Sequence, residues 1–106
     1  MEFKYIVVFI TTPAGKGEEI AQKLVEEKLA ACVNVVDKVS SLYWWQGKIE
    51  KDKENLLVVK TKADLFKKLV KRVKEIHPYT VPEIIALPIV DGNEDYLSWI
   101  DESVNP

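Results

Sequence analysis

Apolar and polar positions along the chain repeat with two different periods. Residues 3–12 hold an almost continuous apolar run, which predicts a central strand of a sheet, covered on at least one face. Residues 16–30 and 61–76 place apolar side chains at helical spacing, which predicts two amphipathic helices. The same criteria predict four further elements: strands at 31–45, 48–61 and 81–89, and a short helix at 94–104.

The order of these elements predicts an α+β fold. Strand, helix, strand, strand, helix, strand is the βαββαβ order of the ferredoxin-like fold, followed here by a C-terminal helix. The fold has a four-stranded antiparallel sheet with two helices on one face, so the open face needs cover. At 106 residues, we expect one domain spanning residues 1–106.

Local signals indicate where the second helix begins and ends. Thr61 and Asp64 resemble a capping box, with Asp in place of Glu, and predict its start. Pro78 disfavours the helical conformation of the preceding residue, so the helix should end at His77. Prolines also lack an amide donor, so the strand that follows should lie at a sheet edge or at a subunit junction.

The two middle strands should form a long hairpin. A tight turn at 46–47 connects them, because glycine adopts the positive φ that hairpin turns need. The first of these strands should be interrupted near 37–38. An isolated two-stranded ribbon is marginal in water. We therefore expect a long hairpin of this kind to need a partner.

The tip of that hairpin carries Tyr43, Trp44 and Trp45. Bulky aromatic side chains on a ribbon favour a partner surface, and one small domain has little to offer them. We expect other copies of the chain to cover these three residues in a homo-oligomer. The alternative is that they fold back on their own core.

Composition narrows the function classes. The net charge is −2, whereas a nucleic-acid-binding domain is usually basic, so no nucleic-acid partner is expected. The single cysteine excludes an internal disulfide and fits a reducing compartment. No apolar run reaches the roughly 18 residues that a membrane span needs, and no signal peptide begins the chain. These features predict a soluble cytoplasmic protein without a membrane partner.

Residues 77–88 contain the only histidine and three of the five prolines. His77 should lie at a stiff helix-to-strand junction beside Tyr79, Thr80 and Glu83. A titratable imidazole in that position is the best candidate for a binding site. The alternative interpretation is that the proline-rich joints only fix a corner of the fold.

Several segments together resemble the CutA family of divalent-cation tolerance proteins. They are the run His-Pro-Tyr-Thr-Val-Pro-Glu-Ile-Ile at 77–85 and the segments 29–34, 43–49, 57–61 and 96–100. The resemblance implies a ferredoxin-like subunit and a tight homotrimer built through the long hairpins. It also implies a role in tolerance of copper or other heavy metals, with no settled enzymatic activity.

The chain departs from the family pattern at three positions. Family members often carry Glu after the His-Pro-Tyr run, where this chain has Thr80. Some members have a cysteine late in the first strand and a second histidine before the motif, where this chain has Ile10 and Ile76. Of that proposed ligand set, only His77 is present.

A metal-binding trimer is the first functional hypothesis. The His77 imidazole would suit Cu(II), Zn or Ni, and a neighbouring subunit would add Glu83, Glu50 or another His77. The chain's folding should require no cofactor. This hypothesis predicts weak Cu(II) binding that disappears in His77→Ala.

Three alternatives remain open. By analogy of fold, a regulatory trimer similar to the nitrogen-regulatory PII proteins would bind a small molecule in a cleft formed by His77, Tyr79, Trp44, Lys60 and Glu83. A non-catalytic scaffold would serve an unknown protein partner. Catalysis is not expected, because no nucleophile–base spacing and no convincing phosphate loop is evident.

Overall fold

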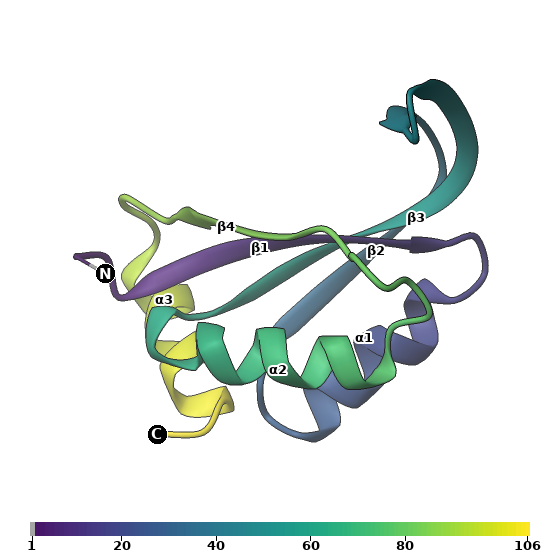
Figure 1. Cartoon of the computed structure of the whole chain (residues 1–106). Helices are drawn as coiled ribbons and strands as arrows, with labels where there is room; N and C mark the ends of the chain where they lie inside the picture. The colour runs from purple at the N-terminus through teal and green to yellow at the C-terminus, as the bar shows by residue number, and fades with distance from the viewer. Residues whose placement is uncertain (1) are drawn as a thin grey trace.

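The computed structural model describes residues 2–106 and contains four strands and three α-helices within them (Figure 1). The elements in chain order are β1 (Tyr5–Pro13), α1 (Gly17–Glu26), β2 (Cys32–Trp45), β3 (Lys48–Lys62), the 3₁₀ turn η1 (Ala63–Leu65), α2 (Phe66–Ile76), β4 (Ile84–Pro88) and α3 (Glu94–Ser103). The predicted order βαββαβ with a C-terminal helix is confirmed.

The four strands form one antiparallel sheet in the order β2-β3-β1-β4. The apolar run of the first strand is central, as predicted, and β4 lies at an edge. Along β1 every second residue is buried, with Ile6, Val8 and Ile10 fully enclosed. Figure 1 shows α1 and α2 on one face of the sheet, with the opposite face open. This is the predicted ferredoxin-like arrangement.

The core lies between the sheet and the helices α1 and α2. Leu24 of α1 and Leu69 and Val73 of α2 are fully buried against β1 and β3. Burying one such side chain stabilises a fold by about 1.5–3 kcal/mol. The helical stripes predicted from the sequence therefore form one continuous core with the alternate residues of the strands.

The first helix is shorter than predicted. It ends at Glu26 rather than at residue 30, because Lys28 takes a left-handed conformation with φ of 58°. The amides of Leu29 and Ala30 both donate to the carbonyl of Leu24, at 3.0 and 3.2 Å. Both residues are buried, so the apolar periodicity of the sequence continues through the turn that follows the helix. This is why the predicted helix extends too far.

The capping box predicted at Thr61 and Asp64 is wrong. Thr61 belongs to β3, and its buried hydroxyl donates to the carbonyl of Leu29 at 2.7 Å. The chain then passes through the 3₁₀ turn, and α2 starts at Phe66 without a side-chain cap. The helix does end where proline requires, since His77 is extended with φ of −86° and ψ of 135°.

The long hairpin is confirmed, including its irregularities. The pairing of β2 with β3 shifts register between Val36 and Val39, and Lys38 has positive φ. The turn residues Gln46 and Gly47 have φ of 50° and 79°. Beyond the shift, residues 39–54 form an arm that curls away from the rest of the sheet (Figure 1).

Candidate functional site

His77 lies at the predicted junction, with both ring nitrogens engaged. Its Nε2 donates to the carbonyl of Thr11 at 2.8 Å, and its Nδ1 accepts from the amide of Tyr79 at 3.0 Å. Because a carbonyl only accepts and an amide N–H only donates, the ring is the neutral tautomer protonated at Nε2. The side chain is 8% exposed. His77 therefore joins the end of β1 to the segment after α2.

A metal ion at His77 would have to displace one of these bonds. Imidazole binds a metal through a free lone pair, and here Nδ1 has given its lone pair to the Tyr79 amide. Within residues 2–106, no three side chains of His, Cys, Asp or Glu lie in a group suited to hold a metal. Within one chain, the bonds of the His77 imidazole are therefore explained by the alternative interpretation, in which residues 77–88 fix a corner of the fold.

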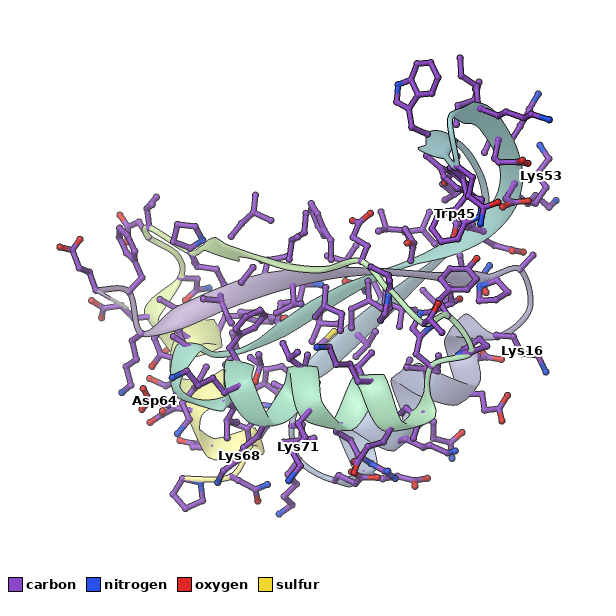
Figure 2. The ribbon with its side chains drawn as sticks, viewed as in Figure 1. Lys16, Trp45, Lys53, Asp64, Lys68 and Lys71 are labelled. Carbon is purple, nitrogen blue, oxygen red and sulfur yellow. The ribbon has the colours of Figure 1, made fainter. Side chains whose placement is uncertain are left out.

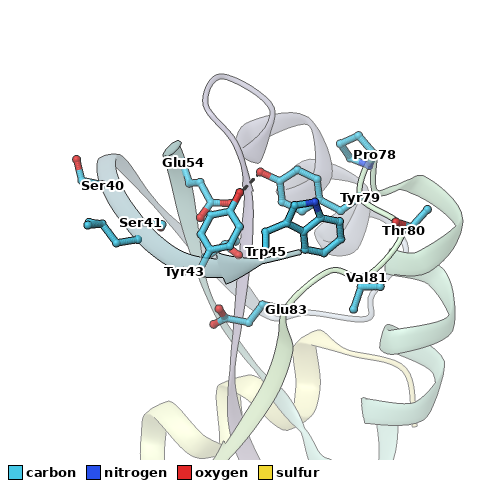
Figure 3. Close-up of a pocket in the computed structure, with 12 residues that line it drawn as sticks. Ser40, Ser41, Tyr43, Trp45, Glu54, Pro78, Tyr79, Thr80, Val81 and Glu83 are labelled. Atoms are coloured by element: carbon cyan, nitrogen blue, oxygen red, sulfur yellow. Dashed lines mark hydrogen bonds between the residues drawn. The ribbon is translucent and has the colours of Figure 1, made fainter. Parts of the chain in front are cut away.

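The neighbouring segment, residues 78–83, forms one side of a cavity of about 750 Å³ whose other side is the arm (Figure 3). Among its lining residues are polar and aromatic side chains of both sides: Thr11, Ser41, Tyr43, Trp45, Glu54, Tyr79, Thr80 and Glu83. Tyr79 and Glu83 are the two predicted cleft residues that the structure brings together here.

Glu54 is a site residue that the sequence analysis missed. It is only 6% exposed, and its Oε2 accepts a hydrogen bond of 2.8 Å from the hydroxyl of Tyr79. Burial, with this bond second, raises the pKa of Tyr79 well above its usual range. Burial and the charge of Glu54 also raise the pKa of Glu83. The carboxylates of Glu54 and Glu83 therefore line the same cavity and interact electrostatically.

A second tyrosine–carboxylate pair lies farther along the arm. The Tyr43 hydroxyl donates to Oδ2 of Asp52, and this bond raises the pKa of Tyr43 to about 12. Glu50, a predicted metal ligand, is the direct cross-strand partner of Tyr43. It is exposed and does not line the cavity. The arm thus adds acidic groups beyond the cavity wall.

Two other predicted cleft residues lie elsewhere in the chain. Trp44 is 73% exposed, and it lies on the face of the arm opposite Tyr43 and Trp45, because successive strand residues alternate. Lys60 lies in the body of the sheet, where its Nζ contacts the amide oxygen of Asn34. Within one chain, the predicted cleft residues therefore do not form a single site, because Trp44 and Lys60 each lie away from the cavity.

The departures from the family pattern also have defined places. Thr80 lines the cavity, so a carboxylate at this position would face Glu54 and Glu83. Ile10 is fully buried in the core, and Ile76 packs against it. Neither isoleucine has an atom that can bind a metal.

A ferredoxin-like subunit with a projecting arm and an acidic, aromatic-lined cavity defines the structural class. The sequence model of the "CutA1 divalent ion tolerance protein" family matches residues 6–103. The chain is 55% identical over 98 residues to the divalent-cation tolerance protein CutA of Thermus thermophilus, covering 92% of this chain and 95% of that protein. This chain belongs to the CutA1 divalent ion tolerance family.

Solved structures agree with this assignment. The Thermus thermophilus Cut A1 structure superposes with a TM-score of 0.93 at 53% identity, covering 95% of this chain and 99% of the other. The Oryza sativa CutA1 structure has a TM-score of 0.94 at 46% identity, covering 97% and 95%. The chain spans only about half of the human protein CutA, with 47% identity over 93 residues, or 87% of this chain.

The relatives differ in the compartment that their names state. The Oryza sativa relative is called chloroplastic, and a structure from Archaeoglobus fulgidus is described as periplasmic. Among the helices of residues 2–106, none has the length and apolar character that crossing a bilayer requires.

Proposed function

We propose that this divalent-cation tolerance protein works as a homotrimer that holds a divalent ion weakly in the cavity between the arm and residues 78–83. The observation that carries the proposal is Glu54, a carboxylate nine-tenths buried in the cavity wall. Among residues 2–106, no basic side chain forms an ion pair with it. A buried charge favours a counter-charge, and a cation in the cavity would supply one.

The donors present are oxygens rather than nitrogens. The carboxylates of Glu54 and Glu83 face the cavity, while both nitrogens of His77 are bonded within the fold. Carboxylate oxygens suit hard ions such as Mn²⁺, Ca²⁺ and Mg²⁺, whereas Cu(II) favours imidazole. Two carboxylates from one chain make a weak site, so we expect a Kd in the millimolar range.

The arm supports the homotrimer. Leu42, Trp44 and Ile49 are each more than half exposed, although they are large and apolar. An exposed apolar ribbon of this kind is typical of an interface, and β4, at the sheet edge opposite β2, offers unpaired backbone groups to a neighbouring copy. Neighbouring copies would cover Tyr43, Trp44 and Trp45 and bring further side chains to the cavity.

Calorimetric titration of Mn²⁺ and Cu(II) into the purified protein tests this proposal. We expect weak Mn²⁺ binding that is lost in Glu54→Gln and Glu83→Gln and retained in His77→Ala. Because the pKa of Glu83 is raised, affinity should increase as the pH rises through its titration. Loss of all binding in His77→Ala, with both Gln variants intact, would restore the His77-centred copper site and overturn the carboxylate site.

A gain-of-function variant gives a second check. Thr80→Glu places a third carboxylate on the cavity wall, where Thr80 already lines it. We expect Mn²⁺ affinity to increase by about tenfold, since a site's ligand charge sets its affinity. The matched control Glu94→Gln, on the distant helix α3, should leave the affinity unchanged.

We further propose that the protein is not an enzyme and resides in the cytoplasm without nucleic-acid or membrane partners. The loop amides of Gly15 and Gly17 both donate to the side chain of Asn55, at 3.2 and 3.1 Å, rather than facing an anion. The only arginine, Arg72, pairs with Glu27 at 2.8 Å. Neither feature supports phosphate chemistry. A scaffold role for an unknown protein partner would be supported by full tolerance activity in Glu54→Gln.

A small-molecule role is the second candidate, and the cavity supports it. Its volume of about 750 Å³ falls in the range of organic ligand sites and is far larger than an ion needs. A thermal-shift screen of metabolites would test this role. Acidic walls make anionic ligands the least favoured class.

A further inference from the structure

The arm gathers its acidic residues on one face, where the one lysine of the arm is Lys48, opposite Trp45 at the tip. In β3 acidic residues alternate with lysines, and successive strand residues point to opposite faces. Glu50 pairs with Tyr43 and Asp52 with Ser41, so these carboxylates share the inner face of the arm with the cavity. Lys53 instead alternates to the other face and donates to the hydroxyl of its cross-strand partner Ser40 at 2.7 Å, although Ser40 also contributes to the rim of the cavity. Figure 2 shows Trp45 and Lys53 on opposite sides of the arm.

Neutral groups hold the inner carboxylates in place. The Tyr79 hydroxyl donates to Glu54, and the Tyr43 hydroxyl donates to Asp52. These bonds orient the carboxylates without neutralising them. Among the residues that line the cavity, none is lysine, arginine or histidine. The cavity therefore has a negative charge that one chain leaves unbalanced.

The walls of the cavity are aromatic. Tyr43 and Trp45 come from the arm and Tyr79 from the opposite side, and Figure 3 shows their rings around one space with Glu54 and Glu83 beside them. Aromatic faces attract cations and also pack against methylene groups. Carboxylates beside aromatic rings, here the buried Glu54 and the exposed Glu83, are the combination that recognises an organic ammonium ion.

We propose that this cavity binds a linear aliphatic polyamine. One ammonium group would pair with Glu54 and Glu83, and its methylene chain would lie against Tyr43 and Trp45. A further ammonium group would reach Asp52, two residues along β3 from Glu54 and so roughly 7 Å away. The inference uses the cavity of the metal proposal but does not require that a metal bind.

Other ligand classes fit these walls less well. An anion would be repelled by Glu54 and Glu83, and a neutral apolar molecule would leave their charges unpaired. A bare metal ion would leave most of a cavity of about 750 Å³ and its aromatic walls unused. A polyamine satisfies the charge, the length and the apolar wall together.

Calorimetry on the intact protein, in the assembly in which it purifies, tests the proposal. Spermidine and diaminobutane are the probes, and butanediol is the neutral control of matched shape. We expect spermidine to bind more tightly than diaminobutane, no heat from butanediol, and affinity that falls as salt increases. If spermidine does not bind, the proposal is overturned. This includes the case in which spermidine is excluded because a lysine of a second copy already fills the cavity.

Variants locate the site. We expect Glu54→Gln and Glu83→Gln each to weaken spermidine binding by about tenfold or more, as expected for a lost charged hydrogen bond. Glutamine keeps the shape of Glu54, and its carbonyl oxygen can still accept the Tyr79 hydroxyl. Trp45→Leu should weaken binding about fivefold, because it removes the aromatic face but retains an apolar side chain.

Glu102→Gln is the matched control, since it removes the same charge from exposed α3. Equal weakening by Glu102→Gln, or unchanged binding in both Glu54→Gln and Glu83→Gln, overturns the proposal. Mn²⁺ titrations of the same variants separate it from the metal proposal. Spermidine binding without Mn²⁺ binding overturns only the metal site, and the reverse result overturns only the polyamine site.

Discussion

The body and the arm belong to one hairpin but bury their apolar residues differently. Leu57, at the base of β3, is 0% exposed, whereas Leu42, on the arm, is 66% exposed. Both residues lie in strand-forming sequences, and β2 and β3 pair with one another along the base and along the arm, with a register shift between Val36 and Val39. The base lies over α1, while nothing in residues 2–106 covers the outer face of the arm. The body buries its apolar residues within one chain, whereas the arm leaves its apolar residues for the proposed homotrimer to cover.

The same contrast holds for charged groups. In the body, Lys4 and Lys62 both approach Asp101 at 3.5 Å, so opposite charges meet. On the inner face of the arm, the side-chain partners of Asp52 and Glu54 within residues 2–106 are tyrosine hydroxyls. The arm therefore offers both unpaired apolar surface and unpaired negative charge.

The largest effect is expected on the outer face of the arm. Trp44 and Ile49 are direct cross-strand partners, and both are exposed in one chain. Replacing both by serine should dissociate the proposed homotrimer into single chains, with a loss of roughly 3–6 kcal/mol per chain if both are buried between copies. Light scattering should then report a species of 12.1 kDa.

Circular dichroism should remain native in that double variant, because the body does not use these side chains. Lys51→Ser, on the same face, is the control and should keep the mass of the assembly. An unchanged mass in the double variant would contradict the role assigned to the arm.

The next effect is expected in the core of the body. Leu69→Ala leaves a cavity beneath the sheet and should lower the free energy of unfolding by about 3 kcal/mol. Denaturant titration measures this loss, and Lys68→Ala on the exposed side of α2 should change it by less than about 0.5 kcal/mol. Equal effects of the two substitutions would contradict the described core.

A smaller loss is expected at His77. His77→Ala removes the bonds to Thr11 and Tyr79 and should destabilise the chain by about 2 kcal/mol. Amide hydrogen exchange at Tyr79 should become faster, which a loss of metal binding alone would not produce. Lys74→Ala, one turn earlier on exposed α2, serves as the control. Unaltered stability and exchange would show that His77 does not brace this corner.

The smallest effect concerns the pH dependence of the arm. Hydrogen bonding to Asp52 raises the pKa of Tyr43 from 10.0 to about 12. Since the folded-state pKa is raised, this contribution to stability is fully present below pH 10 and is lost as the pH rises through about 12. Ultraviolet difference titration of the protein against Tyr43→Phe measures the ionisation. In Asp52→Asn it should move towards pH 10, and an unmoved titration would exclude the bond.

Much of the fold followed from the periodicity of the sequence. The buried run at 3–12, the turn at 46–47 and the helix end before Pro78 were predicted because each depends on neighbouring residues. The first helix was predicted too long, because Leu29 continues its apolar period but lies in a turn. Thr61 was taken for a cap because its true acceptor, the Leu29 carbonyl, lies 32 residues away in the sequence.

The candidate site was predicted only in part. Tyr79 and Glu83 were expected because they adjoin the histidine, whereas Glu54 was missed. The alternation of acid and lysine at 50–54 did carry the signal that Glu54, Asp52 and Glu50 share a face. It did not indicate which face the arm curls towards, or that Tyr79 would meet Glu54.

By itself the sequence determined the elements, the long hairpin with aromatic residues at its tip, and the position of the lone imidazole. Those features depend on side-chain periodicity and on the backbone restrictions of proline and glycine, which act over a few residues. The tertiary structure decided that His77 has both nitrogens bonded and that Glu54 is buried. It also decided that Trp45 lines the cavity while Trp44 lies on the opposite face of the arm. These outcomes depend on contacts between segments distant in the chain, which the packing of the sheet and the curl of the arm bring together.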